Sequence, residues 1–238
     1  IVSGDFYWYK ESTDESGRKL NYIAAIDCTG HGVPGAFMSM IGNTLLNEII
    51  DKKSAVDTNE ILEQLDEGII KALKQDTSDN DGGMDVCFCK IVYNDDDTID
   101  LQFSGAKRPL YLFMEGSNEL LKLDGTIRSI GGRQQSRSRR NSNRAQKKRP
   151  KKPFEAHNFV LKKGSEVYLS SDGLVDQNGK SQDGTEKPKF GTKKLLETLK
   201  EIHTEKMDDQ SSRFNQLLEE HKEGAEQRDD ITLIGLRL

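Results

Sequence analysis

The sequence predicts an α+β fold with antiparallel sheets. Strand-like segments come in runs, and several follow one another between residues 84 and 123 with only short turn sequences such as NDDD and EGSN between them. Helical segments come in two pairs, one before this run and one near the C-terminus. Because parallel α/β folds alternate single strands with single helices, this order indicates antiparallel sheets instead.

The expected strands are rich in β-branched and aromatic residues and end at turn formers. They span 2–9, 20–28, 84–93, 99–104, 109–114, 119–123, 159–161, 166–170 and 231–238. Helices are expected over 35–52, 57–73, 192–203 and 209–221, where apolar residues recur at helical spacing. The residues DTNE at 57–60 predict a capping box at the start of the second helix.

Length and composition place the chain among single globular domains. It has 238 residues, 34% of them hydrophobic and 32% charged, and no stretch approaches the roughly 20 apolar residues of a membrane helix. Cys28, Cys87 and Cys89 form no C-x-x-C pair, which argues against a disulfide framework and against structural zinc. We therefore expect a cytoplasmic domain, since the sequence has no signal peptide. We also expect this domain to be truncated at its N-terminus, because the sequence opens within a strand.

One segment stands apart in charge. Residues 133–152 hold ten Lys or Arg and no acid, whereas the rest of the chain has a formal charge of −15. Few apolar residues lie here, so the segment is expected to be a mobile loop within the domain. The second interpretation is that the segment binds an acidic protein partner. Because the segment has no aromatic residues to stack on bases, its composition argues against nucleic acid as the partner.

Four aspartates share one setting, the end of an apolar strand beside glycine or polar turn residues. They are Asp5, Asp27, Asp172 and Asp229. Taken singly, each is more simply explained as a turn former. Taken together, carboxylates converging at sheet edges repel one another, and a hard divalent cation such as Mg²⁺ or Mn²⁺ offsets that repulsion. Two such ions can activate water and bind a phosphoryl group.

Longer motifs surround these aspartates. In order along the chain they read GDFYW from Gly4, DCTGHGVPGA from Asp27, SGA from Ser104, SSDGLVDQ from Ser170 and RDDIT from Arg228. Together they resemble the SpoIIE-type branch of the bacterial metal-dependent (type 2C-like, PPM) protein serine/threonine phosphatases. The motifs keep the order found in that family and cover nearly the whole chain.

The resemblance implies one SpoIIE-like domain over residues 1–238, an antiparallel β-sandwich flanked by helices in α-β-β-α layers. It also implies two Mn²⁺ or Mg²⁺ ions at one edge. By this resemblance Asp27 would bridge both ions, and Asp5 and the backbone carbonyl of Cys28 would bind the first. Asp172 and Asp229 would hold the second, and Asp27, Asp172 and Asp229 would be the catalytic set.

Five further residues are assigned supporting or substrate roles. By the resemblance, Asp176 would orient water at the metals, and Asp230 would support Asp229. Gly30 and His31 lie in the turn before the first helix, where His31 is either a general acid or, as we prefer, a turn residue. Arg108 is a possible contact for substrate phosphate, although a solvent-facing hairpin charge is the simpler interpretation.

The implied function is hydrolysis of phosphoserine or phosphothreonine on a regulatory protein, often an anti-sigma-factor antagonist. An upstream sensor domain in the same chain or complex would control it, as the output domain of a bacterial signalling protein. The alternative is a non-catalytic interaction module of the same fold that binds a regulatory partner. A nucleic-acid binder acting through residues 133–152 is a third interpretation.

Overall fold

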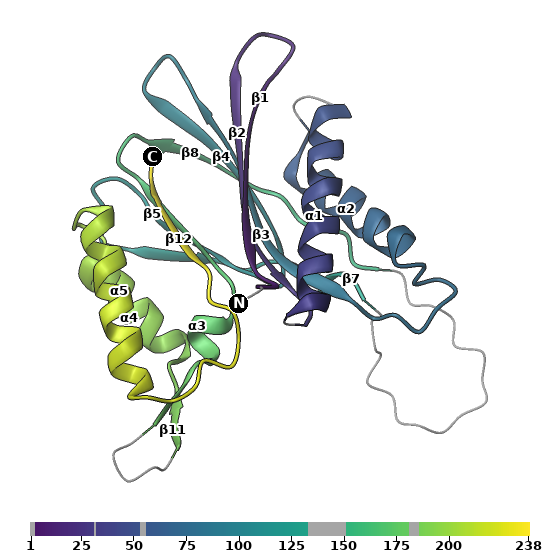
Figure 1. Cartoon of the computed structure of the whole chain (residues 1–238). Coiled ribbons are helices and arrows are strands. Elements are labelled where there is room, and N and C mark those ends of the chain that lie inside the picture. The colour runs from purple at the N-terminus through teal and green to yellow at the C-terminus, as the bar shows by residue number, and fades with distance from the viewer. Residues whose placement is uncertain (1–2, 31, 53–55, 133–150, 181–185) are drawn as a thin grey trace.

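The computed structural model describes residues 3–30, 32–52, 56–132, 151–180 and 186–238. In this part of the chain, the elements lie in four layers, with two sheets packed face to face and helices outside each (Figure 1). In order, the elements are β1 (Phe6–Thr13), β2 (Lys19–Cys28), α1 (Val33–Lys52), α2 (Thr58–Ala72), β3 (Gly83–Tyr93), β4 (Thr98–Ala106), β5 (Leu110–Phe113), β6 (Leu120–Leu123), β7 (Ile130–Gly131), β8 (His157–Lys162), β9 (Glu166–Ser170), α3 (Gly173–Asp176), β10 (Asn178–Lys180), β11 (Glu186–Lys189), α4 (Gly191–Ile202), α5 (Met207–Lys222) and β12 (Leu233–Arg237).

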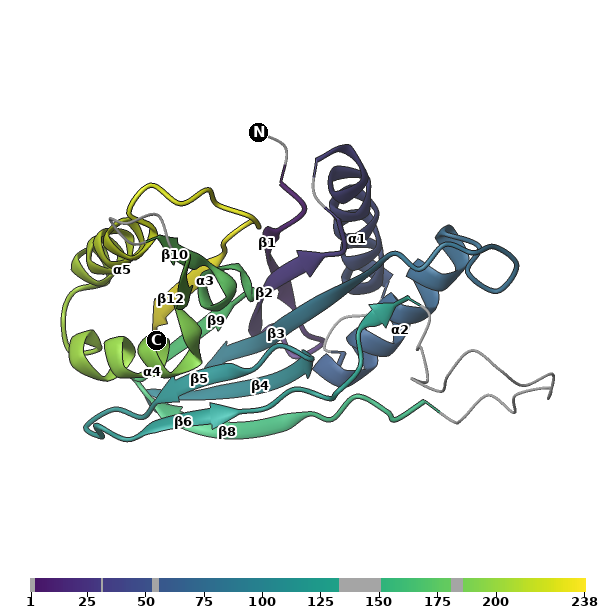
Figure 2. The ribbon, with the colours of Figure 1, turned by 90° about the horizontal axis from the view of Figure 1, so that it is seen from below.

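The larger sheet has the order β1-β2-β3-β4-β8, with β7 also pairing with β3. All of its pairs are antiparallel. The smaller sheet has the order β12-β9-β5-β6 and is antiparallel throughout. This confirms the α+β class and the layered sandwich, and Figure 2 shows the two sheets with α1 and α2 on one side and α4 and α5 on the other.

Buried apolar side chains fill the three spaces between the layers, and β3 shows how one strand serves two of them. Met84, Val86 and Phe88 point toward α1 and α2, whereas Cys87 and Cys89 alternate with them and point between the sheets. Because both faces of β3 are covered, its sequence is a nearly unbroken apolar run. A third cluster, built around Tyr168 and the helices α4 and α5, lies on the outer face of the smaller sheet.

The predicted capping box at the second helix is wrong. Asp57 is the N-cap residue of α2, but its side chain makes no capping hydrogen bond. Its carboxylate instead accepts hydrogen bonds from Lys90 and Gln102, and the Gln102 side-chain oxygen accepts one from the Thr58 N–H. A neighbouring strand therefore satisfies the helix terminus, which the local sequence pattern could not indicate.

Most of the basic segment lies outside the described residues, so the loop expected over 133–152 stays a prediction. Its last two residues are described. The Lys151 ammonium pairs with Asp66, and the Lys152 carbonyl accepts a hydrogen bond from Arg128. Across the part of the chain that the structure describes, no helix is both long and apolar enough to span a membrane.

Candidate metal centre

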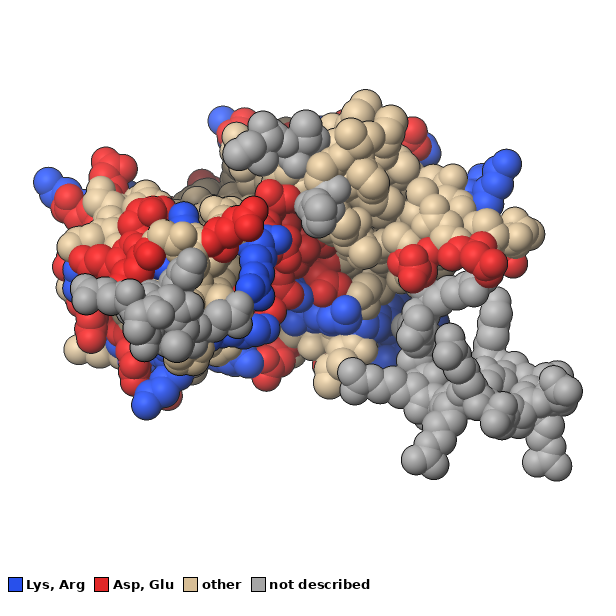
Figure 3. All heavy atoms as spheres, turned by 60° about the horizontal axis from the view of Figure 1, so that its bottom comes forward, with Lys and Arg blue, Asp and Glu red and all other residues tan. Residues whose placement is uncertain are grey.

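The four aspartates meet where both sheets end. Asp27 is near the end of β2, and Asp5 immediately precedes β1, which pairs with β2 from Phe6 onward. Asp172 follows β9, and Asp229 precedes β12, the partner strand of β9. Seen from this end, acidic side chains gather between the two halves of the molecule, with Lys and Arg side chains beside them (Figure 3).

A pocket of about 270 Å³ opens at this edge. Asp27, Asp172 and Asp229 line it, together with Asp85 on β3 and the cations Lys107 and Arg228. Cys28, Thr29, Gly30 and Ser129 complete the lining. Three of the four aspartates therefore line one pocket, and their roles as ligands stay a prediction. Asp5 is not among its lining residues but lies close enough for its charge to act on Asp27.

One carboxylate oxygen of Asp5 is buried without a hydrogen-bond partner among the described residues. This atom is Oδ2, and the Asp5 side chain is buried. Burial raises the pKa of the Asp5 carboxyl to about 6, and the charges of Asp230 and Asp229 act in the same direction. An orphaned buried carboxylate oxygen in a set of carboxylates is a fitting donor for a hard cation.

Among the aspartates that line the pocket, Asp27 has the most strongly raised pKa. Burial, followed by the charges of Asp172 and Asp5, raises its pKa from 3.8 to about 8. With no bound metal ion, the Asp27 carboxyl is therefore costly to ionise at neutral pH. The donor set of the pocket is rich in carboxylate oxygen and contains a fully protonated thiol, since burial raises the pKa of Cys28 to about 12. This chemistry fits Mg²⁺ or Mn²⁺ better than a thiolate-bound metal.

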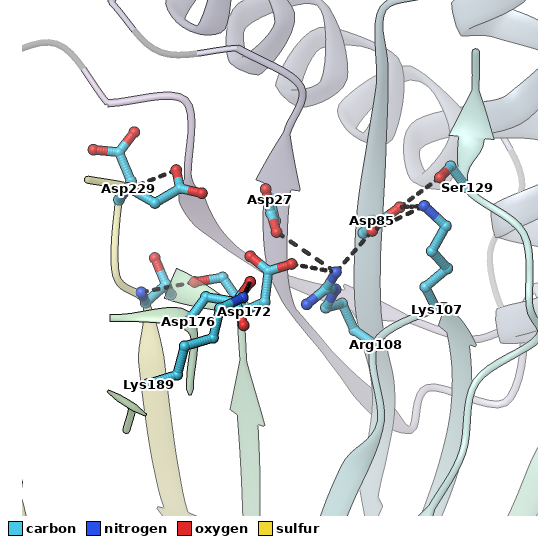
Figure 4. Close-up of polar contacts among 12 residues, drawn as sticks. Asp27, Asp85, Lys107, Arg108, Ser129, Asp172, Asp176, Lys189 and Asp229 are labelled. Carbon is cyan, nitrogen blue, oxygen red and sulfur yellow. Dashed lines mark hydrogen bonds and ion pairs between the residues drawn. The ribbon is translucent and has the colours of Figure 1, made fainter. Parts of the chain in front are cut away.

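Arg108 is inside the site, and the interpretation of it as a solvent-facing hairpin charge is wrong. Its Nη2 atom lies 2.8 Å from Asp85, 2.8 Å from Asp172 and 3.9 Å from Asp27 (Figure 4). Burial alone would lower the pKa of the guanidinium, but its hydrogen bond to Asp85 and the charge of Asp172 raise it overall. Arg108 therefore supplies the positive charge at the centre of these carboxylates.

The side chains are not arranged as a finished ligand cage. Among the described residues, no three Asp, Glu, His or Cys side chains are grouped closely enough to surround one ion. The Arg108 guanidinium lies 2.8 Å from Asp172 and 3.9 Å from Asp27. Ligation by these two residues would require the guanidinium to give up those contacts.

The supporting residues are spread more widely. Asp230 accepts a hydrogen bond of 2.7 Å from the Gly4 N–H and so ties the segment before β12 to the segment that carries Asp5. Asp176 forms an ion pair with Lys189 at 2.9 Å, away from the described pocket lining. Its predicted role in orienting water stays a prediction, and His31 lies outside the described residues.

Gly30 and Cys28 belong to the turn between β2 and α1. Gly30 adopts a φ of +92°, which favours glycine. A Cβ on Gly4 would lie 2.6 Å from the Gly30 carbonyl oxygen and 3.3 Å from that of Cys28. Both carbonyls therefore point toward the segment preceding Asp5, and only a residue without a side chain fits between them.

Sequence reasoning missed Asp85 and Ser129. Asp85 accepts hydrogen bonds from Arg108 and, at 2.6 Å, from the Ser129 hydroxyl. One signal was available, because Asp85 is the only charged residue in the apolar run MDVCFC. An acid within a strand that is buried on both faces needs partners.

Comparison with known proteins decides the family. The sequence profile of the Stage II sporulation protein E (SpoIIE) family matches residues 19–238. The chain belongs to the SpoIIE family. Its fold is that of the PP2C-type phosphatase domains, a family of serine/threonine phosphatases that act in signalling. A search of curated protein sequences gives no match.

Solved structures agree with this assignment. The SiaA-PP2C domain of Pseudomonas aeruginosa is 27% identical, with a TM-score of 0.74 over 100% of this chain and 81% of that one. The PP2C phosphatase domain of SpoIIE from Bacillus subtilis, with a fragment of its regulatory domain, is 16% identical at a TM-score of 0.66. All of this chain matches 59% of that structure. RsbX, whose structure is a complex with magnesium, is 14% identical at a TM-score of 0.57, over 99% of this chain and 87% of RsbX.

Proposed function

We propose that this SpoIIE-family domain is a Mn²⁺- or Mg²⁺-dependent protein phosphatase that hydrolyses phosphoserine or phosphothreonine on a regulatory protein. The observation that carries the proposal is the meeting of Asp27, Asp172 and Asp229 in one pocket at the edge of both sheets. The buried, unpartnered oxygen of Asp5 beside them supports a cation requirement. The magnesium complex of RsbX, a protein of the same fold, is consistent with that choice of metal.

Each residue would contribute in its own way. Two divalent ions at this site would supply a nucleophilic water and neutralise phosphoryl charge. Asp27 would bridge the two ions. Asp5 and the Cys28 carbonyl would hold one ion, and Asp172 and Asp229 the other. Arg108 would contact the phosphate, since a guanidinium matches two phosphoryl oxygens at once.

The substrate and its context follow from the same proposal. A pocket of about 270 Å³ would admit a phosphorylated side chain and leave the rest of the substrate outside. We propose a phosphorylated regulatory protein, such as an anti-sigma-factor antagonist, in the cytoplasm, with an upstream sensor domain as the source of control. The chain matches only 59% of the SpoIIE structure that includes a regulatory fragment, which is consistent with further controlling parts.

The direct test is hydrolysis of p-nitrophenyl phosphate and of a phosphoserine peptide with Mn²⁺, with Mg²⁺ and with chelator. We expect activity with metal that chelator abolishes. We expect Asp27→Asn to lose at least about a hundredfold in kcat, because the variant loses a bridging charge at the reacting centre. Full activity of Asp27→Asn would reject the assignment of this pocket as the catalytic site.

A non-catalytic interaction module of the same fold is the alternative. The carboxylates that would be dispensable in such a module are all retained. Calorimetry with Mn²⁺ separates the two proposals, since an interaction module has no need to bind metal. Absence of Mn²⁺ binding at millimolar concentration would favour the module.

A further inference from the structure

Asp85 differs from the other carboxylates of the pocket because this chain already supplies its partners. One oxygen accepts a hydrogen bond of 2.8 Å from Arg108, and the other accepts one of 2.6 Å from Ser129. The Lys107 ammonium lies 3.3 Å from the same carboxylate. Asp5 has a buried oxygen without a partner, whereas Asp85 has three donors. Asp85 is therefore built to hold cations of the chain itself (Figure 4).

The backbone at the end of β4 is shaped to aim both cations at Asp85. Lys107 adopts a φ of +57°, an uncommon and costly conformation for a residue with a side chain. The Lys107 N–H donates to the Thr126 carbonyl, and the Arg108 N–H donates to the Ala106 carbonyl. The chain thus reverses tightly here and sends two consecutive cationic side chains back over β3.

Two glycines make this reversal possible. A Cβ on Gly105 would lie 2.3 Å from the Arg108 carbonyl oxygen and 2.8 Å from the Gly125 Cα. A Cβ on Gly125 would lie 2.7 Å from the same Arg108 oxygen. The two segments cross with no room for side chains, so the placement of Lys107 and Arg108 is fixed by backbone packing. The strained turn thus places Lys107 in the pocket lining and Arg108 against the pocket carboxylates Asp85 and Asp172, an arrangement to be expected at a functional site.

We propose that Asp85 is a positioning residue that, with Ser129, holds Arg108 and Lys107 as a phosphate-binding wall on the β3–β4 side of the pocket. The proposal rests on the proposed phosphatase function and deepens it. Divalent metal ions bound to Asp27 and Asp172 would neutralise those two carboxylates in place of Arg108, so Arg108 would no longer pair with them. Asp85 would then be the remaining partner of Arg108 and would hold the Arg108 guanidinium beside the pocket. A phosphate monoester in the pocket would contact both Arg108 and Lys107.

The competing assignment is that Asp85 is itself a metal ligand. It lines the same pocket and lies opposite Asp27 on the neighbouring strand. The two assignments differ in what they couple to Asp85. A positioning role couples it to phosphate affinity, whereas a ligand role couples it to metal affinity.

The test compares Asp85→Asn, Arg108→Lys and Arg108→Ala with wild type, all in the Mn²⁺-loaded form. Asp51→Asn is the matched control, because Asp51 forms an ion pair with Lys10 at 2.6 Å but lies on the exposed end of α1. Calorimetry would give the dissociation constants for Mn²⁺ and, with Mn²⁺ present, for inorganic phosphate. Steady-state hydrolysis of p-nitrophenyl phosphate would give KM and kcat separately. Circular dichroism would confirm that each variant is folded.

For Asp85→Asn we expect phosphate affinity to fall and KM to rise by about tenfold, the value of one hydrogen bond to a charged group. The dissociation constant for Mn²⁺ should stay within about twofold of wild type, and Asp51→Asn should change none of these quantities. Arg108→Lys keeps the charge but not the fork, so it should show a smaller loss of phosphate affinity than Arg108→Ala.

Two results would overturn the proposal. Equal losses of Mn²⁺ and phosphate affinity in Asp85→Asn would make Asp85 a metal ligand. Unchanged phosphate affinity and KM in both Asp85→Asn and Arg108→Ala would show that these residues do not contribute to phosphate binding. Failure of the proposed function would give a different result, because the wild-type protein would then hydrolyse no phosphate monoester. Phosphate binding could still be compared between wild type and Asp85→Asn in that case.

Discussion

Asp27 and Asp85 are register partners on the antiparallel strands β2 and β3, so two carboxylates lie directly opposite each other at the edge of the larger sheet. Like charges in such cross-strand positions destabilise a sheet. The structure resolves the two sides differently. Asp85 is surrounded by donors, whereas Asp27 lies 3.9 Å from Arg108, shares a hydrogen bond with Asp172 and carries a raised pKa.

This difference predicts how the stability of the metal-free protein depends on pH. The folded-state pKa of Asp27 is about 8, against 3.8 for an ordinary aspartate. A raised pKa means that the folded state binds the proton more tightly than the unfolded state. The associated stability is complete below about pH 4 and is lost as pH rises through about 8. Metal-free protein should therefore lose unfolding free energy on the order of 3 kcal/mol between about pH 5.5 and 8.5.

Asp27→Asn is the variant that isolates this effect, because asparagine has nearly the same shape and does not ionise. Urea unfolding in the presence of chelator should show a smaller loss of unfolding free energy across this pH range than in wild type. The same variant should lose Mn²⁺ binding, so the gain in apo stability and the loss of metal affinity would come from one carboxylate. An identical pH profile for both proteins would show that Asp27 is not the titrating group.

The buried pair Arg128–Asp66, which does not line the pocket, predicts a large stability effect. Both side chains are 3% exposed, and they pair at 3.0 Å. Arg128 also bonds Glu63 and the Lys152 carbonyl, and Asp66 accepts the Gly131 N–H. Arg128→Met leaves the Asp66 charge with fewer partners and should cost about 3 kcal/mol of unfolding free energy.

A matched control for that substitution is Lys52→Met. Lys52 pairs with Glu48 at 3.1 Å, but both side chains are more than half exposed. Such a pair contributes less than about 1 kcal/mol. Urea unfolding of both variants would compare the two environments directly, and equal losses would contradict the assignment of a special role to burial.

The three thiols should be unreactive in the folded protein. Cys28, Cys87 and Cys89 are all buried and free. Burial raises the pKa of Cys28 to about 12, and burial followed by the neighbouring Cys89 raises the pKa of Cys87 well above its ordinary value. Only the thiolate attacks a disulfide reagent. Native protein near pH 8 should therefore react far more slowly than protein unfolded in urea, and rapid native labelling would contradict the burial of these residues.

Side-chain pattern predicted the α+β class with antiparallel sheets, and the family resemblance implied the layers. The strand at 166–170 was predicted at its observed bounds, and the helices near 192 and 209 differ from the observed ones by one or two residues at each end. The short elements α3, β7, β10 and β11 were not predicted. They contain two to four residues, too few for a hydrophobic period to show, and contacts with other elements maintain them.

The site divides in the same way. Asp27, Asp172 and Asp229, which line one pocket, could be proposed as site residues because strand ends and motifs are visible in a single sequence. Asp85 and Ser129 were missed, and Arg108 was placed on the surface, because their roles depend on which strands become neighbours. The backbone reversal that brings Arg108 to the carboxylates depends on the close crossing of Gly105 and Gly125. These two glycines are well separated in the sequence, so no local motif reveals their contact.

Gly35→Ala tests whether the turn before α1 positions the metal site. A Cβ at Gly35 would lie 2.3 Å from the Gly30 carbonyl oxygen and 2.9 Å from the Gly4 Cα. These contacts are backbone atoms of the two segments that carry Asp5 and follow Asp27, so neither can move without shifting a carboxylate. We expect a loss of about 1–3 kcal/mol in unfolding free energy from overpacking, together with weaker Mn²⁺ binding in calorimetry.

Gly68→Ala makes the same chemical change where nothing rigid opposes it. A Cβ there would lie 3.0 Å from the Leu45 side chain, which can adjust, and Ala is favoured over Gly by about 1 kcal/mol inside a helix such as α2. Its unfolding free energy should change little, and its Mn²⁺ affinity should match wild type. If Gly35→Ala also kept wild-type Mn²⁺ affinity despite its lower stability, the turn would support the fold without positioning the metal ligands. A loss of affinity in Gly35→Ala alone would instead mean that the contact of Gly4, Gly30 and Gly35 sets the distance between Asp5 and Asp27, and thereby the geometry of the metal centre.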